Sequence, residues 1–428
     1  MKFWDKNDLR DPSVGTGKTI TLGIQHTFTM FGATILVPII LSEFGMSISV
    51  ALFMAGIGTL IFHLITRGGV PIFLGSSFAF IAPIFAAASA YGLESALGGI
   101  VVAGLIYILL ALLVYLLGAG TIINWFPPIV TGSVIMVIGL GLAPVAVNMA
   151  SAGGGDEITA SSWLLALMSF AIVVIVSVFL KGFFKALPVL IGIVVSYVIA
   201  ALITVTGIAP IIDFSAVAEA AWFGFPEFTV AKFDLAAIVL VAPVAVCTMV
   251  EHIGDVMAVG AICDRDFVKK PGLHRTLIGD GIATSISAMF GGPANTTYSE
   301  NTGVLALTRQ VNPAIMRIAA VFAIILGLVP KLGALISTIP TPIIGGISIV
   351  LFGMIASVGA RTLVENKVDF QQSRNLIISA VILVLGIGGA VVPFSIGSVA
   401  FGIEGMALAA IVGIILNQIL PGKQKYKK

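Results

Sequence analysis

Runs of apolar residues separated by short polar segments occupy almost the whole chain. A helix needs roughly 20 residues to span a bilayer, whereas strands of a membrane barrel alternate in polarity over ~10 residues, and the runs fit the first pattern. They predict an all-α polytopic membrane protein with about fourteen transmembrane segments. The first half contains predicted segments at 19–42, 49–66, 70–84, 96–118, 126–148, 162–180 and 186–207. The second half contains predicted segments at 236–260, 273–289, 293–308, 313–330, 340–359, 375–391 and 400–420.

The composition supports a membrane protein. Of the 428 residues, 58% are hydrophobic and 10% are charged, whereas soluble domains carry about 25% charged residues. The mean hydropathy is +1.14. The 48 glycines fit closely packed membrane helices, because small residues let helix backbones approach one another. We therefore expect the lipid bilayer as the environment, with no disulfide framework, no cleavable signal peptide and no nucleic-acid partner.

The basic residues predict the orientation in the membrane. If the N-terminal tail, 1–18, is cytoplasmic, 20 of the 22 lysines and arginines fall in cytoplasmic segments. The positive-inside rule then places both 1–18 and the basic tail 421–428 on the cytoplasmic side of the cell's inner membrane. The cytoplasmic set is Lys2, Lys6, Arg10, Lys18, Arg67, Lys181, Lys185, Arg265, Lys269, Lys270, Arg275, Arg309, Arg317, Arg361, Lys367, Arg374, Lys423, Lys425, Lys427 and Lys428. The outer loops carry acids instead, namely Glu43, Asp156, Glu157, Asp213, Glu219 and Glu227.

The third segment of each half is unusual. Seven segments followed by seven would place the two halves in opposite orientation, as in inverted repeats. The third segment of the first half contains Gly75-Ser76-Ser77-Phe78, and that of the second half contains most of the polar run from Gly291 to Asn301. Paired, interrupted segments at matching positions indicate the substrate site of a transporter, because non-helical backbone at membrane depth must be buried in protein or line a cavity. We predict that segments 3 and 10 are short and broken.

Carboxylates within the apolar segments are the main candidates for chemistry. Glu251 and Asp255 are four residues apart, so a helix places them on one face, and Glu300 is the one carboxylate in the polar run. A buried polar cluster that only fixes helix packing would have the same pattern. If Glu251 and Glu300 face one small, dry cavity, both cannot ionise cheaply, so the pair should bind a proton. Such a pair also accepts N–H bonds from a ligand.

Aromatic and backbone groups would complete this site. Phe78 can stack on a flat ring, and backbone N–H groups near Phe78 and Ser299, at the starts of the broken helices, can donate to carbonyl groups. Ser77 and Tyr298 are neighbours of these groups in sequence and are included among the predicted substrate-binding residues. The site therefore suits a small planar molecule with both N–H donors and C=O acceptors.

Other polar residues in the apolar segments are more ambiguous. Gln25 and His26 either brace the helix bundle or contact the ligand, and the two interpretations are equally supported. His63 and His274 are expected to be structural or solvated. Asp280 is expected to brace the ninth segment or to lie near its end, outside the site. We expect no metal site and no cofactor other than H⁺ as the coupling ion.

One motif resembles a known family. The run from Glu300 to Arg309 fits the pattern of the nucleobase–ascorbate transporters, which is Gln, Glu or Pro, then Asn-x-Gly, four residues, Thr and a basic residue. Gln25-His26, Glu251-His252-Ile253-Gly254 and Asn295-Thr296-Thr297-Tyr298 are similar to bacterial uracil permeases in order and spacing. The resemblance implies uracil:H⁺ symport by alternating access of a core domain against a gate domain. It implies core segments at 19–118 and 236–330, gate segments at 119–235 and 331–420, and a homodimer through the gate domain.

The resemblance also assigns roles to residues. Glu251 and Glu300 would bind the ring, Phe78 and Ser299 would donate from their backbones, and Asn301 would support them. Asp255 and Ser299 stand where a related uracil permease has histidine and glycine, and Phe352 stands where it has a gate-facing tyrosine. The candidate proton acceptors are therefore Glu251, Asp255 and Glu300. Alternatives are a xanthine or uric acid carrier, another nucleobase symporter or an anion exchanger of the same architecture, and a membrane-embedded enzyme.

Overall fold

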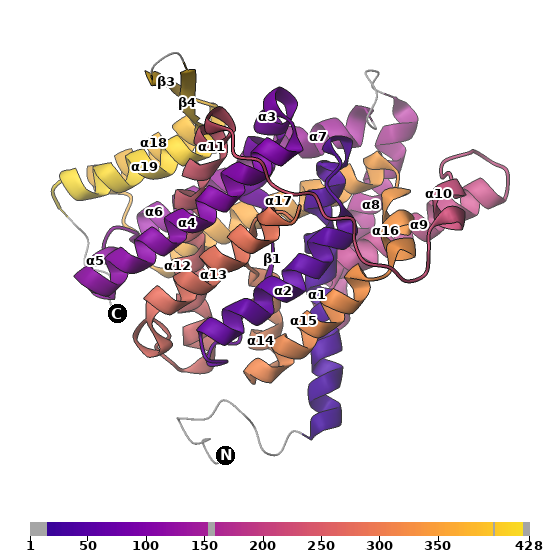
Figure 1. Ribbon diagram of the computed structural model, residues 1–428, viewed down its shortest axis with the longest axis horizontal. Helices are drawn as coiled ribbons and strands as arrows, with labels where there is room; N and C mark the ends of the chain where they lie inside the picture. The colour runs from indigo at the N-terminus through magenta and orange to yellow at the C-terminus, as the bar shows by residue number, and fades with distance from the viewer. Residues whose placement is uncertain (1–14, 153–158, 397–398, 423–428) are drawn as a thin grey trace.

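The computed structural model describes residues 15–152, 159–396 and 399–422. Most of the predicted cytoplasmic tails, and the outer-loop acids Asp156 and Glu157, lie outside the described residues. Within them the chain is predominantly helical (Figure 1). Eight helices, or nine if one bent pair is counted as a single span, are long and apolar enough to cross a membrane in the described part of the chain. This observation supports a multi-pass membrane protein.

The elements follow the predicted segments closely in most places. The first half contains α1 (Thr16–Ile40), α2 (Ile48–Ile65), β1 (Leu74–Ser76), the 3-10 turn η2 (Phe78–Phe80), α3 (Ile81–Tyr91), α4 (Leu93–Leu117), α5 (Ala119–Ile123), α6 (Pro128–Gly141), α7 (Ala143–Ala152), α8 (Ala160–Phe179), α9 (Pro188–Val205) and α10 (Ser215–Glu219). The second half contains α11 (Leu235–Val241), α12 (Ala245–Cys263), α13 (Leu273–Met289), β2 (Asn295–Thr297), α14 (Ser299–Thr308), α15 (Pro313–Gly327), α16 (Pro330–Ser337), α17 (Thr341–Glu365), α18 (Ser373–Ile387), β3 (Val391–Ile396), β4 (Val399–Glu404) and α19 (Gly405–Ile419).

Local sequence explains where several helices begin. Proline is favoured at the first helical position because its fixed φ suits the helix and its missing N–H would be unpaired there. The helices that begin with proline are α6, α9, α15 and α16. At the start of α11, the Asp234 carboxylate accepts hydrogen bonds from the N–H groups of Ala236 and Ala237, at 2.8 and 3.1 Å. These bonds satisfy N–H groups that have no partner inside the helix.

Helix α4 illustrates why these segments suit lipid. Leu105, Leu109, Leu112 and Leu116 recur every three or four residues along it, and all four are exposed. Residues at this spacing share one face of a helix, so they form an apolar stripe on the outside of the protein. An exposed apolar stripe of this length is compatible with a hydrocarbon environment.

The two broken segments meet each other. Strand β1 pairs with β2 in an antiparallel two-stranded sheet, with Leu74 opposite Thr297 and Ser76 opposite Asn295. Each strand is followed by a helical segment, η2–α3 after β1 and α14 after β2. The predicted interruptions at 70–84 and 293–308 are thus short strands, buried in protein as backbone at membrane depth requires.

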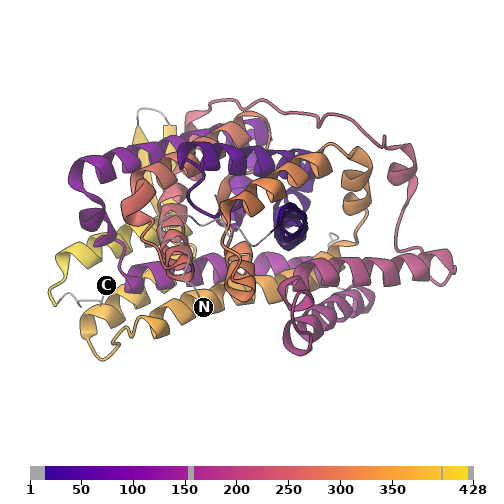
Figure 2. The ribbon, with the colours of Figure 1, turned by 90° about the horizontal axis from the view of Figure 1, so that it is seen from below.

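Corresponding helices of the two halves make corresponding contacts. By position in the two halves, α1, α2 and α4 correspond to α11, α13 and α15. Helix α2 packs against α15, and its counterpart α13 packs against α4. Helix α1 contacts α15, and its counterpart α11 contacts α4. In the same way, α8 packs against α9 and α18 packs against α19. The α8–α9 pair lies at one end of the molecule and the α18–α19 pair lies at the other (Figures 1 and 2).

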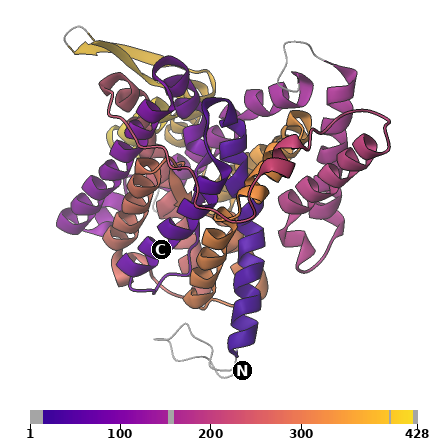
Figure 3. The same cartoon turned by 45° about the vertical axis from the view of Figure 1, so that its right-hand side comes forward.

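Three features differ from the sequence prediction. The all-α prediction was incomplete, because β3 and β4 form a hairpin between α18 and α19 in addition to the β1–β2 pair (Figure 3). The predicted segment 313–330 ends at Gly327, and α16 then turns by 78° relative to α15. The predicted segment 126–148 corresponds to one candidate span, Pro128–Ser151, but its helix is interrupted at Leu142, between α6 and α7.

Candidate functional site

Three carboxylates converge where α12 faces the start of α14. Glu251 and Asp255 lie one turn apart on α12, and Glu300 is the second residue of α14. Glu251 is close enough to interact electrostatically with Asp255, Glu300 and Asp280. Glu251, Asp255 and Glu300 are half-buried. Both glutamates belong to the second half of the chain, whereas Phe78 belongs to the first.

Two hydroxyl groups hold the Asp255 carboxylate. Thr297 Oγ1 donates to Oδ2 at 2.5 Å, and Ser299 Oγ donates to Oδ1 at 2.9 Å. These bonds connect α12 to the end of β2 and to the first residue of α14. The Ser299 side chain is therefore used within the protein, which leaves its backbone N–H at the helix start as the group available to a ligand.

Phe78 and Phe352 contact each other. Phe78 begins the turn η2 after β1, and its side chain is buried. Its ring centroid is 5.8 Å from that of Phe352 on α17, with the two rings at 72°. The structure thus brings the residue predicted to flank the substrate ring against the residue predicted to lie in the gate.

Ser77 is a buried part of the strand connection. Its backbone N–H donates to the carbonyl oxygen of Ala294 at 2.9 Å, extending the β1–β2 pairing by one bond. Its side chain is fully buried. Ser77 therefore lies beside the predicted substrate residues and also holds the two broken segments together.

The Tyr298 side chain is also used within the fold. Its hydroxyl donates to the carbonyl oxygen of Ser76 at 3.0 Å and accepts from Thr34 Oγ1 at 3.2 Å. Its ring occupies the space that a Cβ atom at Gly75 would need, so a side chain at Gly75 would overlap the ring. Tyr298 therefore links β2, β1 and α1 through its side chain.

His26 and Asn301 connect α1 to α14. Asn301 Nδ2 donates to His26 Nδ1 and to the His26 carbonyl oxygen, both at 3.1 Å. Both side chains are buried, whereas Gln25 is partly buried. Of the two interpretations left open by the sequence, bracing therefore has direct structural support for His26.

Threonines on neighbouring helices hold the two strands in matching ways. Thr59 on α2 accepts from the N–H of Leu74 at 2.9 Å and lies 3.2 Å from the Leu74 carbonyl oxygen. Thr284 on α13 donates to the carbonyl oxygen of Asn295 at 3.0 Å. The helix preceding each strand thus positions that strand, and with it the helix start that follows.

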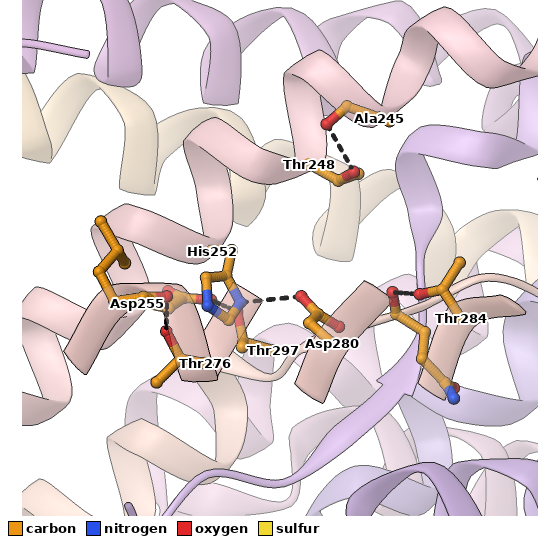
Figure 4. Close-up of polar contacts among 10 residues, drawn as sticks. Ala245, Thr248, His252, Asp255, Thr276, Asp280, Thr284 and Thr297 are labelled. Carbon is orange, nitrogen blue, oxygen red and sulfur yellow. Dashed lines mark hydrogen bonds and ion pairs between the residues drawn. The ribbon is translucent and has the colours of Figure 1, made fainter. Parts of the chain in front are cut away.

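His252 and Asp280 form a fully buried pair that sequence reasoning did not place in the site. His252 Nδ1 on α12 lies 2.8 Å from Asp280 Oδ2 on α13, and neither side chain is exposed. Figure 4 shows the imidazole and the carboxylate pointing toward each other across the two helices. Tyr107 and Phe62 pack edge-on against the imidazole, with centroids 6.2 and 6.5 Å away. Asp280 lies in the middle of α13 and braces it against α12; the adjacency of His252 to Glu251 was the only sequence signal for this pair.

The described residues contain no group of three or more His, Cys, Asp or Glu side chains arranged to hold a metal ion. The hydrogen bonds to Asp255 come from the hydroxyl groups of Thr297 and Ser299. Such a set is suited to hydrogen bonding with a neutral polar molecule.

The sequence is similar to known permeases over nearly its full length. Residues 17–395 match the model of the permease family. A uracil permease from Bacillus caldolyticus is 48% identical over 423 residues, covering 97% of this chain and 95% of that protein. A uracil permease from Bacillus subtilis is 46% identical over 412 residues, covering 94% and 92%. The putative pyrimidine permease RutG of Escherichia coli is 41% identical over 420 residues, covering 96% and 92%.

The fold is similar to those of solved transporters with distant sequences. The transmembrane domain of a cyanobacterium bicarbonate transporter, BicA, aligns with a TM-score of 0.61 at 16% identity, covering 94% of this chain and 96% of that one. The murine anion transporter Slc26a9 in its inward-facing state aligns with a TM-score of 0.68 at 10% identity, covering 96% and 69%. At these identities the likeness concerns the fold alone.

Proposed function

The chain belongs to the nucleobase–ascorbate transporter family, and from this premise we propose that it imports uracil together with a proton. Transport, and not catalysis, is the activity for which its relatives are named, which confirms the prediction that the chain is not an enzyme. The observation that carries the proposal is the convergence of Glu251 and Glu300 beside the start of α14.

The chemistry of this convergence suits uracil. Uracil is a flat ring with two N–H donors and two C=O acceptors. The carboxylates of Glu251 and Glu300 accept N–H bonds, and the first N–H groups of α14 donate to a carbonyl oxygen. The Phe78 ring supplies an apolar face next to the site. The uracil permeases at 46–48% identity support this substrate.

A proton is the coupling ion that these residues favour. Glu251, Asp255 and Glu300 interact electrostatically, and neighbouring carboxylates in a low-dielectric site repel each other when all are ionised. One proton bound on entry of neutral uracil reduces this repulsion and lowers the cost of moving the site through the membrane. Asp255 is held by two hydroxyls, whereas Glu251 and Glu300 face the proposed ligand, so we assign the transported proton to the glutamate pair.

Alternating access is the transport mechanism that fits the architecture. Fourteen spans are obtained if β1–α3 and β2–α14 each count as one broken span and α6–α7 and α11–α12 each count as one continuous span. The matching contacts of corresponding helices support two inverted repeats of seven spans. In this proposal the core domain, 19–118 and 236–330, carries the site and moves against the gate domain, 119–235 and 331–420. The Phe78–Phe352 contact would lie at the boundary between them.

We also propose a membrane location and an assembly for the transporter. We place it in the cytoplasmic membrane with both termini inside, as the distribution of basic residues indicates. A homodimer through the gate domain is the expected assembly.

Uptake into proteoliposomes tests the function. We expect labelled uracil to accumulate when the outside is more acidic than the inside, and to stop accumulating when a protonophore collapses that gradient. Glu300→Gln should abolish accumulation, whereas Glu219→Gln, which neutralises an exposed acid in α10, should not change it. Accumulation that is indifferent to the gradient would remove the symport assignment. Stronger competition by xanthine than by unlabelled uracil would instead indicate a purine carrier of the same fold.

A further inference from the structure

A cavity lies where the end of α2 meets the beginning of α15, and none of the three carboxylates lines it. It has a volume of about 320 Å³ and is lined by Leu60, His63, Leu64, Arg67, Gly68 and Arg317. Helices α2 and α15 pack against each other along their length (Figure 1). None of these six residues belongs to the site proposed for uracil, so the cavity needs a separate explanation.

The charge of this cavity is positive. Among the described residues, its lining contains two arginines and no carboxylate. Arg67 is exposed, and Arg317 packs its guanidinium over Gly68, where a Cβ atom would lie 2.8 Å from Nη1. The C-terminal end of the α2 dipole is negative and the N-terminal end of α15 is positive, so the two dipoles oppose each other and the arginines decide the local potential. An anion is therefore the favoured occupant.

One wall of the same cavity is apolar and faces outward. Leu64 is 78% exposed, and Leu60, one turn earlier on α2, also lines the cavity. An exposed leucine on a membrane helix contacts acyl chains. The cavity thus combines a basic end with an apolar wall, as an ionised lipid head group and its attached chain would require.

His63 is a buried residue that lines the cavity and also contacts the backbone just before β1. The imidazole is 2% exposed, and its Nε2 lies 3.0 Å from the carbonyl oxygen of Ile72, just before β1. Its Nδ1 is buried and has no hydrogen-bond partner among the residues that the structure describes. Arg317 is close enough to act electrostatically on the imidazole. A ligand at the arginines would therefore contact a residue that holds the backbone leading to β1.

We propose that this cavity binds the phosphate head group of an anionic phospholipid. Arg67 and Arg317 bind the phosphate oxygens, because guanidinium groups recognise phosphate through paired N–H donors. Leu60 and Leu64 contact the first part of an acyl chain. Both arginines belong to the set predicted to be cytoplasmic, where basic cavities between membrane helices attract anionic head groups.

Lipid binding to the purified full chain tests the proposal. Native mass spectrometry would measure the dissociation constants of phosphatidylglycerol and phosphatidylcholine. Each arginine near a membrane surface contributes about fivefold to the affinity for an anionic lipid, so Arg67→Gln and Arg317→Gln should each weaken phosphatidylglycerol binding about fivefold. The double variant should weaken it about 30-fold. Arg361→Gln is the matched control, since that exposed guanidinium instead binds Glu365 at 2.6 Å.

Several results would overturn the proposal. One is that the double variant binds phosphatidylglycerol as tightly as the parent protein does. Another is that the parent protein binds phosphatidylcholine as tightly as phosphatidylglycerol. A third is that equimolar inorganic phosphate displaces the lipid. The last result would assign the cavity to a free anion. If the Arg317 variants fail to fold, Arg67→Gln alone tests the proposal, because it changes an exposed side chain. Arg67→Lys should recover part of the affinity lost in Arg67→Gln, because lysine restores the positive charge.

Discussion

Removing the hydroxyl of Tyr298 tests whether this side chain stabilises the fold or binds the substrate. The side chain is 3% exposed, and its hydroxyl bonds to the Ser76 carbonyl and to Thr34 Oγ1. Tyr298→Phe keeps the ring that packs over Gly75 and deletes only the oxygen. The Ser76 carbonyl then loses a buried partner at a cost of about 1–3 kcal/mol. Thr34 keeps a weak bond to Met30 Sδ at 3.3 Å, so its loss is smaller, about 0.5–1.5 kcal/mol.

The expected result is destabilisation with substrate binding largely retained. The unfolding free energy of Tyr298→Phe should fall by about 1.5–4.5 kcal/mol in equilibrium unfolding of the reconstituted protein. The dissociation constant of uracil, measured by calorimetry on the folded fraction, should rise by less than about tenfold, because the carboxylates and the start of α14 are unchanged. Tyr91→Phe is the control, since Tyr91 is 42% exposed and should give the parental stability. The reasoning is refuted if Tyr298→Phe has the parental stability but binds uracil about a hundredfold more weakly.

Three further predictions address the site and the packing. Glu300→Gln should weaken uracil binding at least about tenfold, because a charge-assisted hydrogen bond becomes a neutral one, and calorimetry at fixed pH would show parental affinity if the assignment is wrong. Asp280→Asn should lower the unfolding free energy by about 3–5 kcal/mol, since it removes one partner of the buried pair with His252; unchanged stability would contradict the bracing role. Gly345→Ala should destabilise α17 by about 1–3 kcal/mol, because its Cβ would overlap the backbone of α7, whereas Gly353→Ala on the same helix meets nothing within 4 Å and should be neutral or slightly stabilising. Similar thermal unfolding temperatures for both glycine variants would count against this packing.

Several interpretations from the sequence agree with the structure because they depend on short-range physics. The spacing of Glu251 and Asp255 placed both on one face of a helix, and the polar residues before Glu300 marked an interruption of a membrane segment. Each of these features depends on neighbours within one or two turns, so the linear order of residues contains the necessary information.

Other features depend on which segments meet in space. Nothing in the local pattern indicated that Gly75 would pair with Thr296, that Tyr298 would use its hydroxyl to link three elements, or that Asp280 would face His252. The hairpin of β3 and β4 and the 78° turn into α16 were likewise missed, because a short apolar run in a membrane protein has the same composition whether it is a strand or a helix end.

The order of residues alone established a multi-pass helical carrier with a few costly acids in apolar segments, because desolvation makes an ionisable group in lipid conspicuous wherever it lies. The partners of those acids were settled only by folding. Hydrogen bonds and charge interactions fall off within a few ångströms, and the groups that come that close belong to helices far apart along the chain.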